Sequence, residues 1–333
     1  MADPHAIASA ILDAIDEPAL IVRDGIVASA NKDAISLLGA RIVGRDLRFA
    51  IRHPLALDTI QSGPAADIEL IGIGSAERPW QLSVRPVPDG TLIRLSDRSA
   101  TRAAERMRTD FVANASHELR TPLATIIGYA ETLADEGAVD EQMRSKFGGT
   151  IQSEAKRMLR IVEDLMSLSR IEADRYRAPE DKVDMAEVVR IALEHAVSLA
   201  EGRGCQLEAS IEPDAPPVLG DFGQLLQLTD NLIANAIRYG CSDKSCIARI
   251  SLHARDRQVI LKVSDEGEGI ASEHLPRLTE RFYRVDSARS RESGGTGLGL
   301  AIVKHIVERH RGTLDIQSEP GRGTEIKVSL PAS

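Results

Sequence analysis

His117 lies within the segment Phe111-Val-Ala-Asn-Ala-Ser-His-Glu-Leu-Arg-Thr-Pro-Leu123, followed directly by Glu118 and, one helical turn later, by Thr121. At about 100° per residue, the apolar residues of this region gather on one stripe, and His117 falls on roughly the opposite face. The stripe consists of Met107, Phe111, Val112, Ala115, Leu119, Ile126 and Leu133. A neutral imidazole that faces solvent can act as a nucleophile near pH 7, and an adjacent carboxylate can take its proton. The segment therefore predicts nucleophilic chemistry at His117, with Glu118 as the general base.

A second group of polar residues repeats at helical spacing in Asn231-Leu-Ile-Ala-Asn-Ala-Ile-Arg-Tyr239. Because residues four apart share a helix face, Asn231 and Asn235 lie together, with Arg238 nearby. Amide oxygens are hard, neutral ligands that suit a Mg²⁺ ion held mostly by phosphates and water. The cluster predicts a face that binds phosphate and Mg²⁺, while helix caps or plain surface amides are the alternative.

Two glycine motifs accompany these amides, Asp265-Glu-Gly-Glu-Gly-Ile270 after a predicted strand and Gly295-Thr-Gly-Leu-Gly-Leu300 at the start of a predicted helix. In the second motif, small residues expose backbone N–H groups and the helix N-terminus adds partial positive charge, which together favour a phosphate chain. The motif is not a Walker A loop, because no Gly-Lys-Ser/Thr follows, and no strand leads into it as in a Rossmann fingerprint. Taken singly, each motif is more typical of a turn than of a phosphate-binding loop.

Helices must position these groups, and residues 99–172 carry the longest helical pattern. Glycine is scarce there, and a break near residues 135–140 predicts two helices, 99–134 and 141–171. A lone hairpin of this length cannot bury its apolar stripe, whereas two hairpins form a four-helix bundle. The pattern therefore predicts a homodimer.

The regions on either side of the hairpin mix helices with strands. Residues 1–98 predict an α/β domain with five short strands, and Asp24-Gly25 is a hairpin-turn signal between two of them. Residues 173–183, rich in charges, predict a linker, and 184–333 predict an α/β sandwich of alternating helices and strands. The whole chain is thus predicted to be a multidomain α+β protein.

The composition of the chain indicates which kinds of binding partner and which cellular compartment to expect. The 333 residues carry a net charge of −9 and only 3% aromatic side chains, which argues against direct nucleic-acid binding. No apolar run approaches the roughly 18 residues of a membrane span. Cys205, Cys241 and Cys246 form no CxxC pair and are expected to be free thiols. A cytoplasmic protein without an intrinsic membrane span is predicted.

The segment around His117 resembles the phosphoacceptor box of the sensor histidine kinases of two-component systems. Residues 231–239, 265–270, 281–286 and 295–300 resemble, in the family's order, the nucleotide-binding boxes of its ATPase domain, and 318–324 resembles its closing turn. Two positions depart from the family pattern. Asp230 stands where an apolar residue is more usual, and Glu325 stands where an aromatic is more usual.

The first region resembles a PAS sensor domain through Asn31, Gly39 and Gly44-Arg-Asp-Leu47. The order of domains also resembles the phosphate-regulon sensors, although the membrane anchor common in those proteins is missing. A PAS domain either binds a ligand or only relays contacts, and the sequence leaves both open, so the ligand is unknown. The region contains no cysteine, which argues against a flavin–cysteinyl adduct.

The resemblance implies that ATP and Mg²⁺ bind, with Asn235 as the metal ligand assisted by Asn231, and Asp265 accepting a hydrogen bond from the adenine amino group. Residues 287–294 would form a nucleotide lid. The implied nucleotide contacts are Asn231, Asn235, Arg238, Tyr239, Asp265, Gly267, Gly269, Ile270, Phe282, Arg284, Gly295, Thr296, Gly297, Leu298, Gly299, Leu300 and Thr324.

The function implied is an ATP-dependent kinase that phosphorylates its own His117 and passes the group to an aspartate of a response-regulator receiver domain. By the same resemblance, Thr121 positions water for dephosphorylating that partner. A regulator dominated by phosphatase activity, and a non-catalytic scaffold of PAS domain and bundle, are the alternatives. Chaperone or mismatch-repair ATPases share the ATP-binding fold but lack the His117 box.

Overall fold

The protein is represented by a computed structural model that describes residues 11–62, 64–73, 78–88, 90–135, 140–174, 177–240, 246–285 and 295–333. The chain forms two compact units, residues 1–110 and 111–333. Each unit has a hydrophobic core of its own. Within the described ranges, no helix combines the length and the apolarity needed to cross a membrane.

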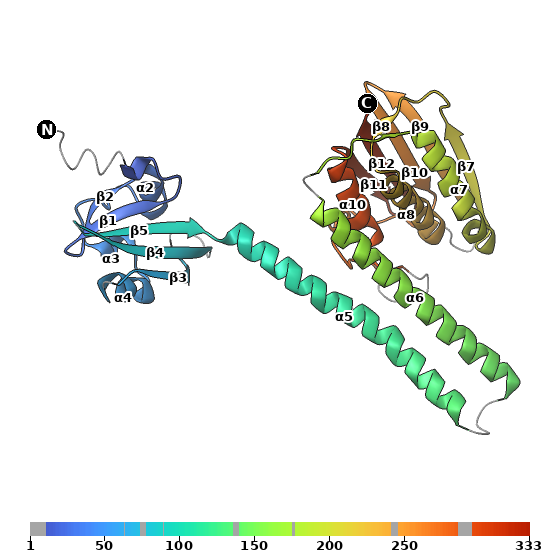
Figure 1. Ribbon diagram of the computed structural model, residues 1–333, viewed down its shortest axis with the longest axis horizontal. Coiled ribbons are helices and arrows are strands. Elements are labelled where there is room, and N and C mark those ends of the chain that lie inside the picture. The colour runs from blue at the N-terminus through green and yellow to red at the C-terminus, as the bar shows by residue number, and fades with distance from the viewer. Residues whose placement is uncertain are drawn as a thin grey trace. The chain divides into compact units, whose positions relative to one another are not determined.

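The first unit is built on a five-stranded antiparallel sheet in the order β2-β1-β5-β4-β3. Its strands are β1 Ala19–Arg23, β2 Ile26–Ala30, β3 Ala66–Ile71, β4 Pro79–Val87 and β5 Gly90–Asp97. Three short helices, α2 Lys32–Leu38, α3 Leu47–Ala50 and α4 Pro54–Ser62, connect β2 to β3 (Figure 1). The five strands predicted for this region are confirmed.

The residues of the β1–β2 turn and of the cap of α2 explain how the first unit begins. Asp24 and Gly25 both have positive φ, 48° and 77°, which matches the right-handed twist of the β1–β2 hairpin. Buried Asn31 caps α2 by accepting a hydrogen bond from the Ala34 amide at 2.9 Å. Its Oδ1 also accepts from the Ala19 amide at 3.0 Å, so one side chain joins α2 to β1.

Two long helices form the predicted hairpin. Helix α5 runs over Ser99–Ala134, and α6, capped by Asp140, runs over Glu141–Ala173. Both predicted helices are confirmed, although α5 begins in the first unit and passes into the second at Phe111. The hairpin exposes large apolar side chains along both helices, namely Met107, Val112, Leu123, Ile127, Met143, Leu159, Val162 and Met166.

The C-terminal part of the second unit, from α7 onward, is an α/β sandwich, as predicted. Its mixed sheet has the order β11-β12-β10-β9-β7, and only the β7–β9 pair is parallel. Helices α7, α8 and α10 pack together on one face of this sheet (Figure 1). The elements are α7 Met185–Gly202, β7 Cys205–Ile211, α8 Phe222–Gly240, β9 Cys246–Arg255, β10 Gln258–Asp265, α10 Gly299–Arg309, β11 Thr313–Glu319 and β12 Gly323–Pro331.

The C-terminal end of α6 is part of the sandwich core. Leu168 and Ile171 are at most 2% exposed and belong to the same hydrophobic cluster as α7, α8 and α10. Ser167 on α6 also donates a hydrogen bond to Gln227 on α8 at 2.6 Å. The hairpin and the sandwich therefore share one core in this unit.

Three features differ from the sequence-based expectations. The predicted linker contains a strand, β6 Lys182–Val183, which pairs with β8 Val218–Leu219. A short helix that was not expected, η1 Leu275–Arg277, lies between β10 and α10. Cys246 is disulfide-bonded, so the expectation of three free thiols is wrong there, whereas Cys205 is free. Cysteine spacing alone could not reveal this, because a disulfide depends on which side chains the folded chain brings together.

Candidate functional site

A cavity of about 600 Å³ lies in the second unit, between the α8–α10 layer and the sheet. Most of the residues with implied nucleotide contacts line it, although they are far apart in the sequence. These lining residues are Asn231, Asn235, Arg238, Tyr239, Asp265, Gly269, Ile270, Arg284, Gly295, Thr296, Gly297, Gly299, Leu300 and Thr324. The fold thus brings together side chains and loops from all four sequence clusters.

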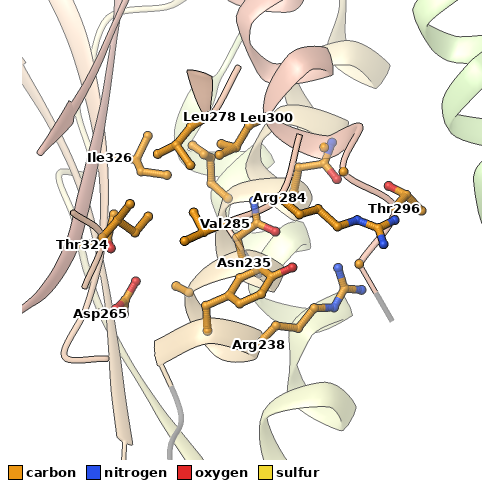
Figure 2. Close-up of a pocket in the computed structure, with 18 of the residues that line it drawn as sticks. Asn235, Arg238, Asp265, Leu278, Arg284, Val285, Thr296, Leu300, Thr324 and Ile326 are labelled. Carbon is orange, nitrogen blue, oxygen red and sulfur yellow. The ribbon is translucent and has the colours of Figure 1, made fainter. Parts of the chain in front are cut away.

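The cavity has two chemically different ends. Figure 2 shows Asp265, Thr324 and Ile326 on the side of the sheet, and Arg238, Arg284 and Thr296 on the opposite side. Asn235 lies between these two groups. One end therefore offers a carboxylate among apolar residues, and the other offers two guanidinium groups and a hydroxyl.

Asp265 ends strand β10 at the apolar end of the cavity. Burial raises the pKa of its carboxyl, while hydrogen bonds from the backbones of Gly267 and Thr324 oppose that shift. The Gly267 amide donates to Asp265 Oδ1 at 2.9 Å, which fixes the side chain at the loop. A buried carboxylate held in this way can accept one more hydrogen bond from a polar ligand edge.

Gly269, in the same loop, has a φ of +69°, which L side chains rarely adopt. A Cβ placed there would lie 2.1 Å from the Glu319 carbonyl oxygen. Glycine is therefore required for the loop after β10 to pack against the turn that follows β11.

Helix α8 supplies the amides in the middle of the cavity. Asn231 and Asn235 both line it, and among the described residues the buried Nδ2 of Asn231 has no hydrogen-bond partner. Buried amide donors are normally satisfied, so this atom is suited to an anionic ligand in the cavity. Burial lowers the pKa of the Arg238 guanidinium, and such a cation gains from a neighbouring anion.

The segment 295–300 forms the loop that leads into α10. Gly297 has a φ of +72°, and a Cβ there would lie 2.9 Å from the Phe282 Cα, so the loop requires glycine. The Thr296 hydroxyl accepts a hydrogen bond from the Leu298 amide at 3.3 Å, next to the first turn of the helix. The N-terminus of α10 thus opens on the polar end of the cavity, where its partial positive charge favours an anion.

Gly267, Phe282 and Leu298 do not line the cavity. Leu298 is fully buried in the core, and Gly267 packs against the Tyr239 carbonyl oxygen, 2.5 Å from where its Cβ would stand. Phe282, with a φ of 63°, packs on Phe111 of α5 with ring centroids 5.9 Å apart. These residues shape the loops around the cavity. The implied lid, residues 287–294, lies outside the described residues.

His117 is exposed on α5 and is not among the residues that line the cavity. The Thr121 hydroxyl donates to the His117 carbonyl oxygen at 3.3 Å, a common bond between a helical threonine and the residue four positions before it. Glu118 Oε2 accepts hydrogen bonds from Arg157 at 3.0 Å and from Arg284 at 2.8 Å. The carboxylate beside the histidine is therefore held by one arginine of the hairpin and one of the sandwich.

Helix α6 contributes lining residues that the sequence motifs did not indicate, namely Arg160, Glu163 and Asp164. The Thr296 hydroxyl donates to Asp164 Oδ2 at 2.7 Å. Burial raises the pKa of Asp164. No local signal marks these residues in the sequence, because they reach the cavity only through the packing of α6 on α10.

Two family models match the chain. Residues 107–174 match the His Kinase A (phospho-acceptor) domain, and residues 220–333 match the histidine kinase-, DNA gyrase B- and HSP90-like ATPase domain. A phosphoacceptor hairpin joined to an ATP-binding domain of this type defines a protein-histidine kinase.

Similar proteins agree with that class. The phosphate regulon sensor protein PhoR of Pseudomonas aeruginosa is 35% identical over 328 residues, 95% of this chain and 73% of that protein. The sensor-like histidine kinase SenX3 of Mycolicibacterium smegmatis is 38% identical over 243 residues, 72% of this chain and 62% of the relative. The sensor protein kinase WalK of Staphylococcus saprophyticus is 35% identical over 242 residues, 73% of this chain but 39% of the relative.

Among solved structures, the Acinetobacter baumannii histidine kinase AdeS matches with a TM-score of 0.50 and 26% identity, over 65% of this chain and 98% of that one. The chain belongs to the sensor histidine kinases. The predicted enzyme class and the resemblance to phosphate-regulon sensors are confirmed.

Asp265 offers a direct test of the apolar end of the cavity. Replacing it with alanine removes a charged acceptor, worth roughly 1.5–3 kcal/mol, so ATP and ADP are both expected to bind about 10–100-fold more weakly. Isothermal titration calorimetry of the two nucleotides measures this, with the exposed Asp214→Ala as the matched control. Unchanged affinity in a variant with a normal melting profile would contradict the assignment.

Proposed function

We propose that this protein is an ATP-dependent kinase that phosphorylates its own His117 and transfers the phosphoryl group to an aspartate of a response regulator. The observation that carries the proposal is the convergence of four separated sequence clusters on one cavity in the same unit as an exposed histidine. The amide, guanidinium and hydroxyl groups at its polar end suit a triphosphate, and Asp265 at the other end suits an adenine amino group.

The residues present also suit Mg²⁺. Asn235 offers a neutral oxygen ligand in the middle of the cavity, and the unpartnered Nδ2 of Asn231 is a free donor for a phosphate oxygen. When bound, Mg²⁺ neutralises charge that develops on the phosphates during transfer. Arg238 and the N-terminus of α10 add positive potential on the same side.

At the histidine, one imidazole nitrogen attacks the γ-phosphorus, so an N–P bond forms as the bond to the β,γ-bridging oxygen breaks. ADP leaves with the electron pair of that bond. The proton on the other ring nitrogen passes to Glu118, which keeps the phosphorylated imidazole neutral. An aspartate of the receiver domain then takes the phosphoryl group and restores the free histidine.

In the conformation described, His117 does not line the cavity and Glu118 is bonded to two arginines. We infer that transfer requires the ATPase domain to move along its own hairpin, or the partner protomer to supply the nucleotide. A homodimer is the assembly we propose, because the apolar residues exposed along α5 and α6 would be buried in a four-helix bundle.

We further propose that the first unit is a PAS-type sensor domain. The support is its five-stranded antiparallel sheet with all of the intervening helices between β2 and β3. Its ligand is unassigned. We propose the cytoplasm as the site of action because the reaction consumes ATP and requires a receiver domain.

Dephosphorylation of the regulator is the second activity we propose. Thr121 lies on the exposed face one turn after His117, where its hydroxyl can orient a water toward a phosphoaspartate. The observation that favours this activity is the engagement of Glu118 by Arg284, since a base held in this way is unavailable to the histidine.

Purified protein given [γ-³²P]ATP, Mg²⁺ and a panel of receiver domains tests the proposal. Rapid labelling of the chain, followed by transfer to one or a few receivers, is expected. Loss of label only from pre-phosphorylated receivers, with no labelling of the chain, would identify a regulator dominated by phosphatase activity. Neither activity would identify a scaffold.

A further inference from the structure

The hairpin also lines the cavity, at its polar end, with three residues of α6: Arg160, Glu163 and Asp164. None of these residues belongs to the four nucleotide-binding clusters. Asp164 contacts the loop before α10 directly, because its Oδ2 accepts a hydrogen bond from the Thr296 hydroxyl at 2.7 Å. Thr296 also accepts from the Leu298 amide at 3.3 Å, so the carboxylate is linked through one hydroxyl to the start of α10.

Asp164 lies in the cavity together with two arginines, Arg160 and Arg238. Burial raises the pKa of the Asp164 carboxyl. The hydrogen bond from Thr296 and the charges of Arg238 and Arg160 oppose that shift. In a partly buried site, these short-range interactions are much stronger than at the protein surface. A carboxylate already occupies the position next to the groups that suit a phosphate.

The Asp164 carboxylate lies at the end of the cavity where the terminal phosphate of a bound nucleotide is expected. Asp265 and Thr324 lie on the side of the sheet, and Thr296 lies on the opposite side with Arg238 and Arg284 (Figure 2). A nucleotide whose base contacts Asp265 therefore extends its phosphates toward Thr296. The terminal phosphate of ATP reaches furthest, and ADP lacks that group.

We propose that Asp164 is a nucleotide-selectivity residue: its carboxylate competes with the γ-phosphate for Thr296 and lowers the affinity for ATP relative to ADP. The inference rests on the proposed function, in which the cavity binds ATP. Because Asp164 belongs to the hairpin, the ATP preference of the enzyme depends on whether α6 is docked at the cavity. A hairpin that moves away removes the competing charge.

Calorimetric titration of ATP and of ADP into the full chain, with Mg²⁺, tests the proposal in the wild type and in Asp164→Asn. The substitution keeps the shape of the side chain and removes its charge. ATP is expected to bind about tenfold more tightly, and ADP less than about threefold more tightly. Asp110→Asn, the same change at an exposed position on α5, is the matched control and should leave both affinities unchanged.

Several outcomes would overturn the proposal. Equal tightening of ATP and ADP would show a general electrostatic effect, and unchanged affinities would show that Asp164 does not compete. Weaker ATP binding only with Mg²⁺ would make Asp164 a metal ligand instead. Asp164→Ala, with a thermal melting profile for each variant, provides a second test if the amide perturbs folding. Failure of the wild type to bind either nucleotide would contradict the proposed function rather than the selectivity.

Discussion

Replacing His117 with glutamine is expected to abolish incorporation of ³²P from [γ-³²P]ATP, with a loss of at least about a thousandfold. Glutamine keeps a polar side chain of similar size on the exposed face of α5, but its amide nitrogen is not nucleophilic. The measurement is the initial rate of labelling at saturating ATP and Mg²⁺. Nucleotide affinity should stay unchanged, because His117 does not line the cavity.

The matched control is His195→Gln, which removes an exposed imidazole from α7. The Nδ1 of His195 lies 3.2 Å from a carboxylate oxygen of Asp230, the residue before Asn231. The variant therefore also measures whether this contact affects the rate of labelling. Labelling at the wild-type rate is expected. Persistent acid-labile label in the His117 variant would assign the phosphoacceptor to another histidine and refute the proposed site.

Replacing Asn235 with alanine is expected to lower kcat/KM for autophosphorylation by about 10²–10³-fold. The amide lies in the middle of the cavity, between the Asp265 carboxylate and the two arginines at the other end, where a Mg²⁺ ligand is proposed. Losing one preorganised group that stabilises transferring phosphate typically has an effect of this size. Initial labelling rates over a range of ATP and Mg²⁺ concentrations give the value.

The metal dependence separates this role from simple contact with the nucleotide. In the presence of EDTA, ATP should bind to the wild type and to Asn235→Ala with similar affinity, since the amide acts through the ion. Gln258→Ala, the loss of an exposed amide at the start of β10, should behave as the wild type. An equal loss of affinity with and without Mg²⁺ would contradict the role as a metal ligand.

Local sequence patterns predicted the helices and most strands of this protein. The helical periodicity of 99–134 and the break near residues 135–140 predicted the bounds of α5 and the start of α6. The Asp24-Gly25 pair gave the first hairpin, because both residues tolerate positive φ. These signals are readable because backbone preference and side-chain periodicity act over a few residues.

The candidate nucleotide-binding clusters were also visible in the sequence, since each of them is a short continuous segment within one loop or one helix. The family resemblance implies that Phe282 contacts the nucleotide, yet in the structure its ring packs on Phe111 of the hairpin. His310 belongs to no motif, yet it is 5% exposed and its Nε2 accepts a hydrogen bond from the Asp221 amide at 3.0 Å. A motif indicates which segment is involved but not where each side chain points.

The motifs of the sequence alone indicated the histidine-kinase class, the candidate phosphoacceptor His117 and the segments proposed to bind ATP. The folded structure was needed to show that α6 lines the candidate cavity and that carboxylates of the hairpin accept hydrogen bonds from Thr296 and Arg284. Asp164 and Thr296 are 132 residues apart, and Glu118 and Arg284 are 166 apart. Such pairs depend on how one packed element docks on another, and no local preference of the chain encodes that docking.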